Sequence, residues 1–198
     1  MRAIRVTQLG GPESVELVEI DEPAADGGIV VDVHAAGVAF PDALLTRGLY
    51  QYKPDLPFTL GAEVAGVVRS APAGAAVKPG DRVVGLTLIT GAMAETAVLT
   101  PERAFPLPDN VSFEAGAGLL FNDLTVYFAL TVRGRLAKGE TVLVHGAAGG
   151  IGTSTLRLAP ALGAGRVIAV VSTQEGARGA MAAGATDVAL AAGFKDSV

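Results

Sequence analysis

Residues 141–152 constrain the fold more than any other part of the chain. They read Thr-Val-Leu-Val-His-Gly-Ala-Ala-Gly-Gly-Ile-Gly, and a helical pattern follows to Leu162. A buried strand that runs through glycines into a helix leaves bare backbone N–H groups at the positive end of the helix dipole, where a pyrophosphate can bind. The segment therefore predicts a dinucleotide-binding strand–turn–helix unit, with a glycine-rich turn that binds no ligand as the alternative.

Two stretches supply the candidate cofactor-binding residues. The turn itself is built from small residues at the positions that a pyrophosphate would approach: Gly146, Ala147, Ala148, Gly149, Gly150, Ile151 and Gly152. At the end of the second strand, where an enzyme that uses NAD usually has a carboxylate for the ribose 2′-hydroxyl, the chain has Ser172 and Thr173. Small hydroxyls leave room for a 2′-phosphate. Arg178 is either the partner of that phosphate or a solvated arginine on its helix. NADPH is therefore favoured over NADH.

The order of elements after residue 122 predicts a parallel α/β sheet. Apolar strands at 141–145 and 166–171 and a shorter one at 187–190 alternate with helices at 151–162 and 175–183. Such a βαβαβ order gives one half of a Rossmann-type sheet, whose complete form has two halves. Pro160 lies inside the first of these helices, so we expect a kink or an early helix end there.

The first half of the chain has a different sequence pattern, which predicts a β-barrel or sandwich. Short β-branched or alternating runs are separated by Gly and Pro turns, with one helix at 41–47 and helical patterns at 113–120 and 123–132. The expected strands are Ala3–Val6, Val15–Ile20, Ile29–Ala35, Glu63–Ser70, Arg82–Leu86, Ala94–Leu99 and Ala104–Leu107. We therefore expect an α/β protein with domains at 1–122 and 123–198.

Composition excludes several classes of function. Fifteen basic and twenty acidic residues give a net charge of −5, which favours neither a nucleic-acid nor a membrane partner. The chain has no Cys and only two His, so a thiolate nucleophile, a disulfide and a conventional structural zinc site are excluded. We expect His34 on the polar face of its strand and His145 in a packing or local hydrogen-bonding role. The N-terminus lacks a signal-peptide pattern, so the expected location is cytoplasmic.

The glycine-rich turn and two further segments resemble one protein family. Residues 37–42 (Gly-Val-Ala-Phe-Pro-Asp), 48–50 (Gly-Leu-Tyr) and 53–68 are similar to the N-terminal signature of the zinc-free, quinone-oxidoreductase-like branch of the medium-chain dehydrogenases/reductases. Residues 122–127 (Asn-Asp-Leu-Thr-Val-Tyr) are similar to its segment at the domain junction. The resemblance covers the whole chain. It implies a GroES-like β-barrel domain followed by a Rossmann domain, and NADPH-dependent reduction of a small hydrophobic quinone or enone, commonly by a homodimer.

The same resemblance suggests roles for individual residues. Tyr50, Asn122 and Thr125 would lie at the nicotinamide and substrate cleft, with packing or helix capping as the alternative for each. Asp42 matches the signature and either contributes to catalysis or supports the fold. Zinc-dependent relatives have Cys and His where this chain has Phe40 and Ala62. No metal is therefore expected, and the neighbouring Glu63 is expected to be a buried polar group on a strand.

Two departures from the family pattern support an alternative function. The branch commonly has Asn where this chain has Ala39, and often Lys where it has Gly176. Only the first mononucleotide half of the Rossmann sheet is recognisable, and strand 141–145 would expose its open edge. The alternative is therefore a truncated or degenerate, non-catalytic nucleotide-binding protein of the same fold. The sequence does not identify the electron acceptor.

Overall fold

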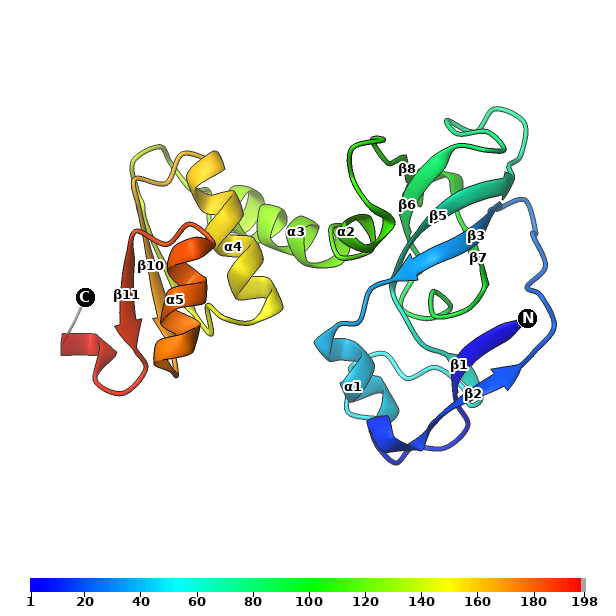
Figure 1. Ribbon diagram of the computed structural model, residues 1–198, viewed down its shortest axis with the longest axis horizontal. Coiled ribbons are helices and arrows are strands. Elements are labelled where there is room, and N and C mark those ends of the chain that lie inside the picture. Colours follow the sequence, from blue (N-terminus) through cyan, green and yellow to red (C-terminus); the bar gives the residue numbers. More distant parts are fainter. Residues whose placement is uncertain (197–198) are drawn as a thin grey trace. The chain divides into compact units, whose positions relative to one another are not determined.

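The computed structural model describes residues 1–196, and the chain divides into two compact units (Figure 1). The first unit runs from Met1 to Phe121, and the second begins at Asn122. The division falls one residue before the expected domain boundary. Each unit has its own hydrophobic core, and each is described by itself below.

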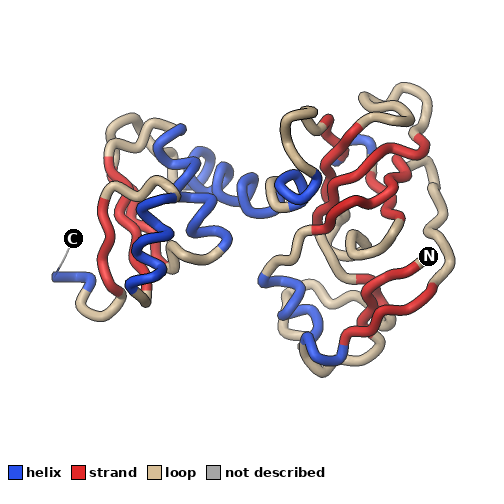
Figure 2. The backbone as a smooth tube through the Cα atoms, in the orientation of Figure 1, coloured by secondary structure: helices blue, strands red, loops and turns tan. Residues whose placement is uncertain are grey.

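The first unit is built from antiparallel strands in two sheets (Figure 2). Its strands are β1 (Arg2–Val6), β2 (Val15–Glu19), β3 (Ile29–Ala36), β4 (Phe58–Thr59), β5 (Glu63–Ser70), β6 (Arg82–Leu86), β7 (Thr96–Leu99) and β8 (Ala104–Pro106). The larger sheet has the strand order β7-β3-β5-β6-β8 and the smaller one the order β2-β1-β4, and Ala3 and Ala94 form an isolated bridge. The helices of this unit are α1 (Phe40–Thr46) and α2 (Phe113–Ala117), with single 3-10 turns at Pro12–Ser14 and Pro101–Arg103.

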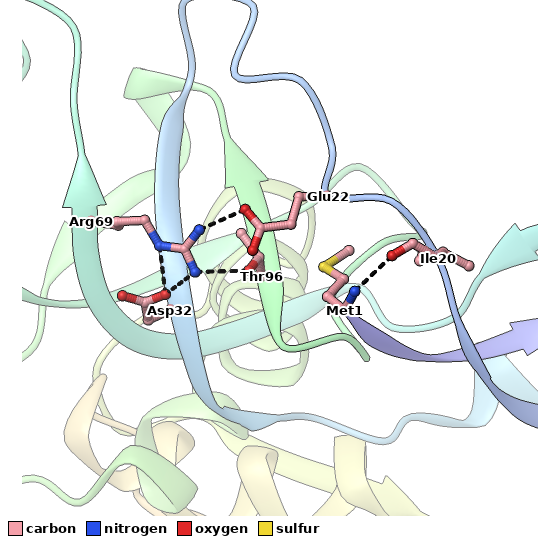
Figure 3. A network of polar contacts seen from close by, with 6 residues as sticks. All are labelled: Met1, Ile20, Glu22, Asp32, Arg69 and Thr96. Atoms are coloured by element: carbon pink, nitrogen blue, oxygen red, sulfur yellow. Dashed lines mark hydrogen bonds and ion pairs between the residues drawn. The ribbon is translucent and has the colours of Figure 1, made fainter.

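The larger sheet surrounds a core of β-branched residues. Ile29, Val31 and Val83 are completely buried there, which explains why these alternating runs form strands. At the surface of this sheet, the Arg69 guanidinium joins three segments that are distant in sequence (Figure 3). It donates to Asp32 and Thr96 and forms an ion pair with Glu22 at 2.7 Å. This network ties strands β5, β3 and β7 to the chain that follows β2.

The second unit is a three-stranded parallel sheet with the order β11-β10-β9. Strand β9 (Thr141–His145) leads into α4 (Gly150–Ala161), β10 (Arg166–Val171) into α5 (Gln174–Ala182), and β11 (Asp187–Leu190) precedes a 3-10 turn at Phe194–Asp196. Figure 1 shows α4 and α5 on one face of the sheet, as right-handed crossovers require. The predicted βαβαβ half is therefore confirmed, and β9 and β11 are its edges within the described residues.

Three expectations about helices and strands were wrong in detail. The pattern at 113–120 breaks at Gly118, which caps α2, and α3 (Leu120–Tyr127) starts two residues later. Helix α3 then gives way to a π-helical stretch at Phe128–Arg133, which the sequence did not indicate. Strand β4 was missed because it has two residues, and its pairing with β1 defines it.

Pro160 lies in the last turn of its helix, and each of the two histidines packs against a phenylalanine ring. Helix α4 ends one residue after Pro160, and the N–H of Leu162 still bonds the carbonyl of Leu158 at 2.9 Å. His34 is exposed and stacks on Phe113 with ring centroids 4.3 Å apart. His145 is exposed and meets the ring of Phe194 edge-on at 4.8 Å.

Candidate functional site: a glycine-rich loop at a helix N-terminus

The loop between β9 and α4 is shaped by its glycines. Gly146 has a φ of +61°, a left-handed conformation that favours glycine. The next residue, Ala147, is completely buried, and its N–H donates to the carbonyl of Val170 at 3.1 Å. The loop is thus tied back to the end of β10, so that the backbone of residues 148–150 remains on the surface.

Two further glycines lie close to neighbouring atoms, Gly152 to backbone and Gly150 to a side chain. A Cβ on Gly152 would lie 2.4 Å from the carbonyl oxygen of Gly146 and 2.5 Å from Cα of Ala147. A Cβ on Gly150 would lie 2.8 Å from Nδ2 of Asn122. The first glycine therefore lets α4 pack on the loop, and the second leaves room for the Asn122 amide.

The N-terminus of α4 is open to a ligand. Its N-cap is Gly149, which has no side chain to accept a hydrogen bond, and the first intrahelical bond runs from the N–H of Thr153 to Gly149 at 2.8 Å. The N–H groups of Gly150, Ile151 and Gly152 precede that bond and have no intrahelical acceptor. Bare donors at the positive end of a helix fit the pyrophosphate of a dinucleotide.

The end of the second strand places the remaining cofactor candidates near this loop. Thr173 is the N-cap of α5, where its Oγ1 accepts the N–H of Gly176 at 3.0 Å. Ser172 and Arg178 are exposed. A Cβ on Gly176 would lie 3.4 Å from Cβ of Ala148, so this part of α5 lies directly beside the glycine-rich loop.

Helix α3 carries two of the expected catalytic residues, Asn122 and Thr125. The Asn122 amide lies against Gly150, whereas Thr125 is exposed on the next turn. The neighbouring Asp123 accepts a hydrogen bond from Nη2 of Arg157 on α4 at 3.0 Å. This ion pair, which was not anticipated, holds α3 beside α4 and so keeps Asn122 at the loop.

The other two expected catalytic residues belong to the first unit. Asp42 is buried, and its carboxylate accepts the N–H of Ala39 at 2.8 Å and that of Gly61 at 3.2 Å. Burial raises its pKa, and the two backbone hydrogen bonds oppose that rise. These contacts fix the start of α1 to the loop before β5. Tyr50 is half-buried and packs on the cluster that contains Leu45 and Phe58.

Glu63 was expected only to be a buried polar group on a strand, and in the structure its carboxylate accepts two specific backbone N–H groups. Its Oε2 accepts the N–H groups of Leu120 and Phe121 at 3.0 and 2.9 Å. No local pattern connects β5 to residues 57 positions later.

Among the described residues, no three His, Asp or Glu side chains gather in a way that could hold a metal ion. Within the same part of the chain, no helix is both long and apolar enough to cross a membrane.

Comparisons with known proteins agree with this architecture. Residues 25–109 match the alcohol dehydrogenase GroES-like domain. Quinone oxidoreductase of Rattus norvegicus is 38% identical over 192 residues, which are 95% of this chain and 58% of that protein. A "probable oxidoreductase" from Mycobacterium abscessus superposes with a TM-score of 0.93 at 44% identity, over 100% of this chain and 64% of the other. Escherichia coli quinone oxidoreductase complexed with NADPH superposes with a TM-score of 0.84 at 36% sequence identity. The match covers 95% of this chain and 58% of the other.

A GroES-like domain followed in the chain by a parallel sheet with this glycine-rich loop is thus similar to oxidoreductases over 95–100% of the chain's length. These similarities support the resemblance to the quinone-oxidoreductase-like branch of the medium-chain dehydrogenases/reductases. The chain spans about 58% of the length of the curated relatives that it matches.

Proposed function

We propose that the protein is an NADPH-dependent oxidoreductase that reduces a quinone or an α,β-unsaturated carbonyl by hydride transfer, without a metal. The observation that carries this proposal is the uncapped N-terminus of α4 behind the loop of residues 146–152. Its support is the similarity to quinone oxidoreductases, one of which was solved with NADPH. A metal-free reaction is proposed because Phe40 and Ala62 occupy the positions at which zinc-dependent relatives have ligands.

Each part of the cofactor has candidate partners in this chain. The N–H groups of Gly150, Ile151 and Gly152 would bind the pyrophosphate, and Ser172, Thr173 and Arg178 would surround the 2′-phosphate. When bound, NADPH would supply the hydride. Asn122 and Thr125 would orient the nicotinamide, and Tyr50 would contact the acceptor. For Asp42, both of whose oxygens accept backbone N–H bonds, the contacts favour support of α1 over proton transfer.

A second function is favoured by two specific residues. Ala39 lacks the amide of the family's Asn, and Gly176 lacks the ammonium of its Lys. The protein would then bind the nucleotide without catalysing hydride transfer, as a degenerate relative of these enzymes. A homodimer is the assembly that we propose in either case, and light scattering coupled to gel filtration would test it.

The deciding experiment measures binding and turnover separately. Isothermal titration with NADPH and NADH is expected to show tighter binding of NADPH. Oxidation of NADPH, followed at its absorbance band with 1,4-benzoquinone as the acceptor, then separates the two functions. Turnover supports the oxidoreductase, and binding without turnover supports the non-catalytic protein. No binding of either nucleotide at millimolar concentration would reject both.

A further inference from the structure

Glu63 is a buried carboxylate whose contacts lie far along the chain. It is the first residue of β5, and only 4% of it is exposed. Its Oε2 accepts two backbone hydrogen bonds, from Leu120 at 3.0 Å and from Phe121 at 2.9 Å. Burying a carboxylate is unfavourable unless it is hydrogen-bonded, so these contacts account for its position.

The two donors are the first N–H groups of helix α3. Such groups have no acceptor within their own helix, and a side chain just before the helix usually supplies one. The residue before α3 is Leu119, which has no side-chain acceptor. The cap is therefore provided by Glu63, and its negative charge lies at the positive end of the helix dipole.

A glycine makes room for this carboxylate. Gly37 follows β3, and its N–H donates to the backbone carbonyl of Glu63 at 3.1 Å. A Cβ on Gly37 would lie 2.6 Å from Oε1 of Glu63 and 2.3 Å from the carbonyl oxygen of Ala117. Any larger residue would displace the Glu63 side chain or the end of α2.

The first turn of α3 also carries Asn122, whose amide lies against Gly150 of the glycine-rich loop. Asp123, the next residue, is held by Arg157 of α4. Asn122 directly follows the two residues whose N–H groups Glu63 accepts, and a helical start of α3 sets the direction in which its amide projects.

We propose that Glu63 is a positioning residue, which caps the first turn of α3 and thereby places the Asn122 amide beside the glycine-rich loop for cofactor binding. The cofactor part of this proposal rests on the proposed function. The positioning itself does not, because it concerns contacts within the protein.

Two conservative variants test the proposal. Glu63→Gln keeps the length of the side chain and one oxygen that can accept both N–H groups. Glu63→Asp keeps the charge but is shorter by one methylene, so its oxygens reach α3 poorly. We expect Glu63→Asp to weaken NADPH binding about tenfold, as loss of a cap implies, and Glu63→Gln to stay within about threefold of the wild type. A carboxylate needed only for its charge would give the reverse order.

Amide resonances in nitrogen–proton correlation spectra provide a readout that is independent of the cofactor. The Gly150 backbone and Asn122 side-chain resonances should move in Glu63→Asp and stay near their wild-type positions in Glu63→Gln. Ser112→Ala is the matched control, because Ser112 caps α2 through the N–H of Ala115 at 3.2 Å. It should lower the melting temperature without changing the dissociation constant or these resonances.

The outcomes separate this proposal from the proposed function. Wild-type affinity and unmoved resonances in Glu63→Asp would overturn it while leaving cofactor binding intact. If the wild type binds no NADPH, the proposed function fails, and the resonances alone decide: a shift in Glu63→Asp supports the positioning role, and none overturns it.

Discussion

At the scale of single residues, we expect Arg178 to determine the preference between NADPH and NADH. It is exposed on α5, one turn after the N-cap Thr173, and carries the cation expected at a 2′-phosphate. Arg178→Ala should weaken NADPH binding about tenfold or more, the value of one charge-assisted hydrogen bond, and leave NADH binding unchanged. Calorimetric titration of both nucleotides checks this. Lys138→Ala removes the same charge from another exposed position of the unit and should affect neither. An equal loss for both cofactors would contradict the assignment.

Asp187 should control the acid side of the stability curve. Bidentate hydrogen bonds from Arg166, at 2.8 and 3.1 Å, and a hydrogen bond from Thr186 lower the pKa of this carboxyl to about 2. A carboxyl group whose pKa is lowered by folding stabilises the folded state at any pH above its ordinary pKa. That stabilisation is lost as the pH falls toward 2. Asp187→Asn should therefore flatten the pH dependence of urea unfolding between about pH 4 and pH 2. An unchanged slope would count against the pair, and Glu175→Gln is the control neutralisation.

At the scale of elements, two helical glycines should respond in opposite ways to the same substitution. Gly152→Ala puts a methyl 2.4 Å from a backbone carbonyl and should destabilise the fold by about 1–3 kcal/mol and prevent NADPH binding. Gly179 lies inside α5 with nothing within 4 Å of an added Cβ. Gly179→Ala should stabilise by about 0.5–1 kcal/mol, because alanine favours the helix. Chemical denaturation and titration with NADPH measure both, and equal effects would contradict the packing.

How far the sequence predicts an element depends on how local its cause is. Strands β5, β6, β9, β10 and β11 were predicted with the observed bounds, since each is an apolar run between strong turn signals. The glycine-rich loop was also predictable, because its cause is local: a glycine cluster between an apolar run and a helical pattern. The break at Gly118 and the cap from Glu63 were not, because the first depends on how α2 packs and the second joins residues 57 positions apart. The Asp123–Arg157 pair likewise requires the packing of α3 on α4.

At the scale of the whole molecule, the two units should unfold as separate bodies. Leu99 is 1% exposed in the core of the first unit, and Leu156 is completely buried in the core of the second. Independent cores of this kind are expected to give separate calorimetric transitions. Leu99→Ala should lower only one transition and Leu156→Ala only the other, by about 2–5 kcal/mol each.

The cofactor should then act on one of these transitions alone. All the residues proposed for the pyrophosphate and 2′-phosphate lie after Asn122, so NADPH at about 100 times its dissociation constant should stabilise that unit by about 2.7 kcal/mol. For a unit of this size, the corresponding rise in melting temperature is on the order of 10–20 °C. The transition that Leu156→Ala lowers is the one that NADPH should raise. A single transition that both variants lower and NADPH raises would instead mean that the units unfold together. In that case the cofactor would stabilise residues 1–121 as well, by linkage through helix α3.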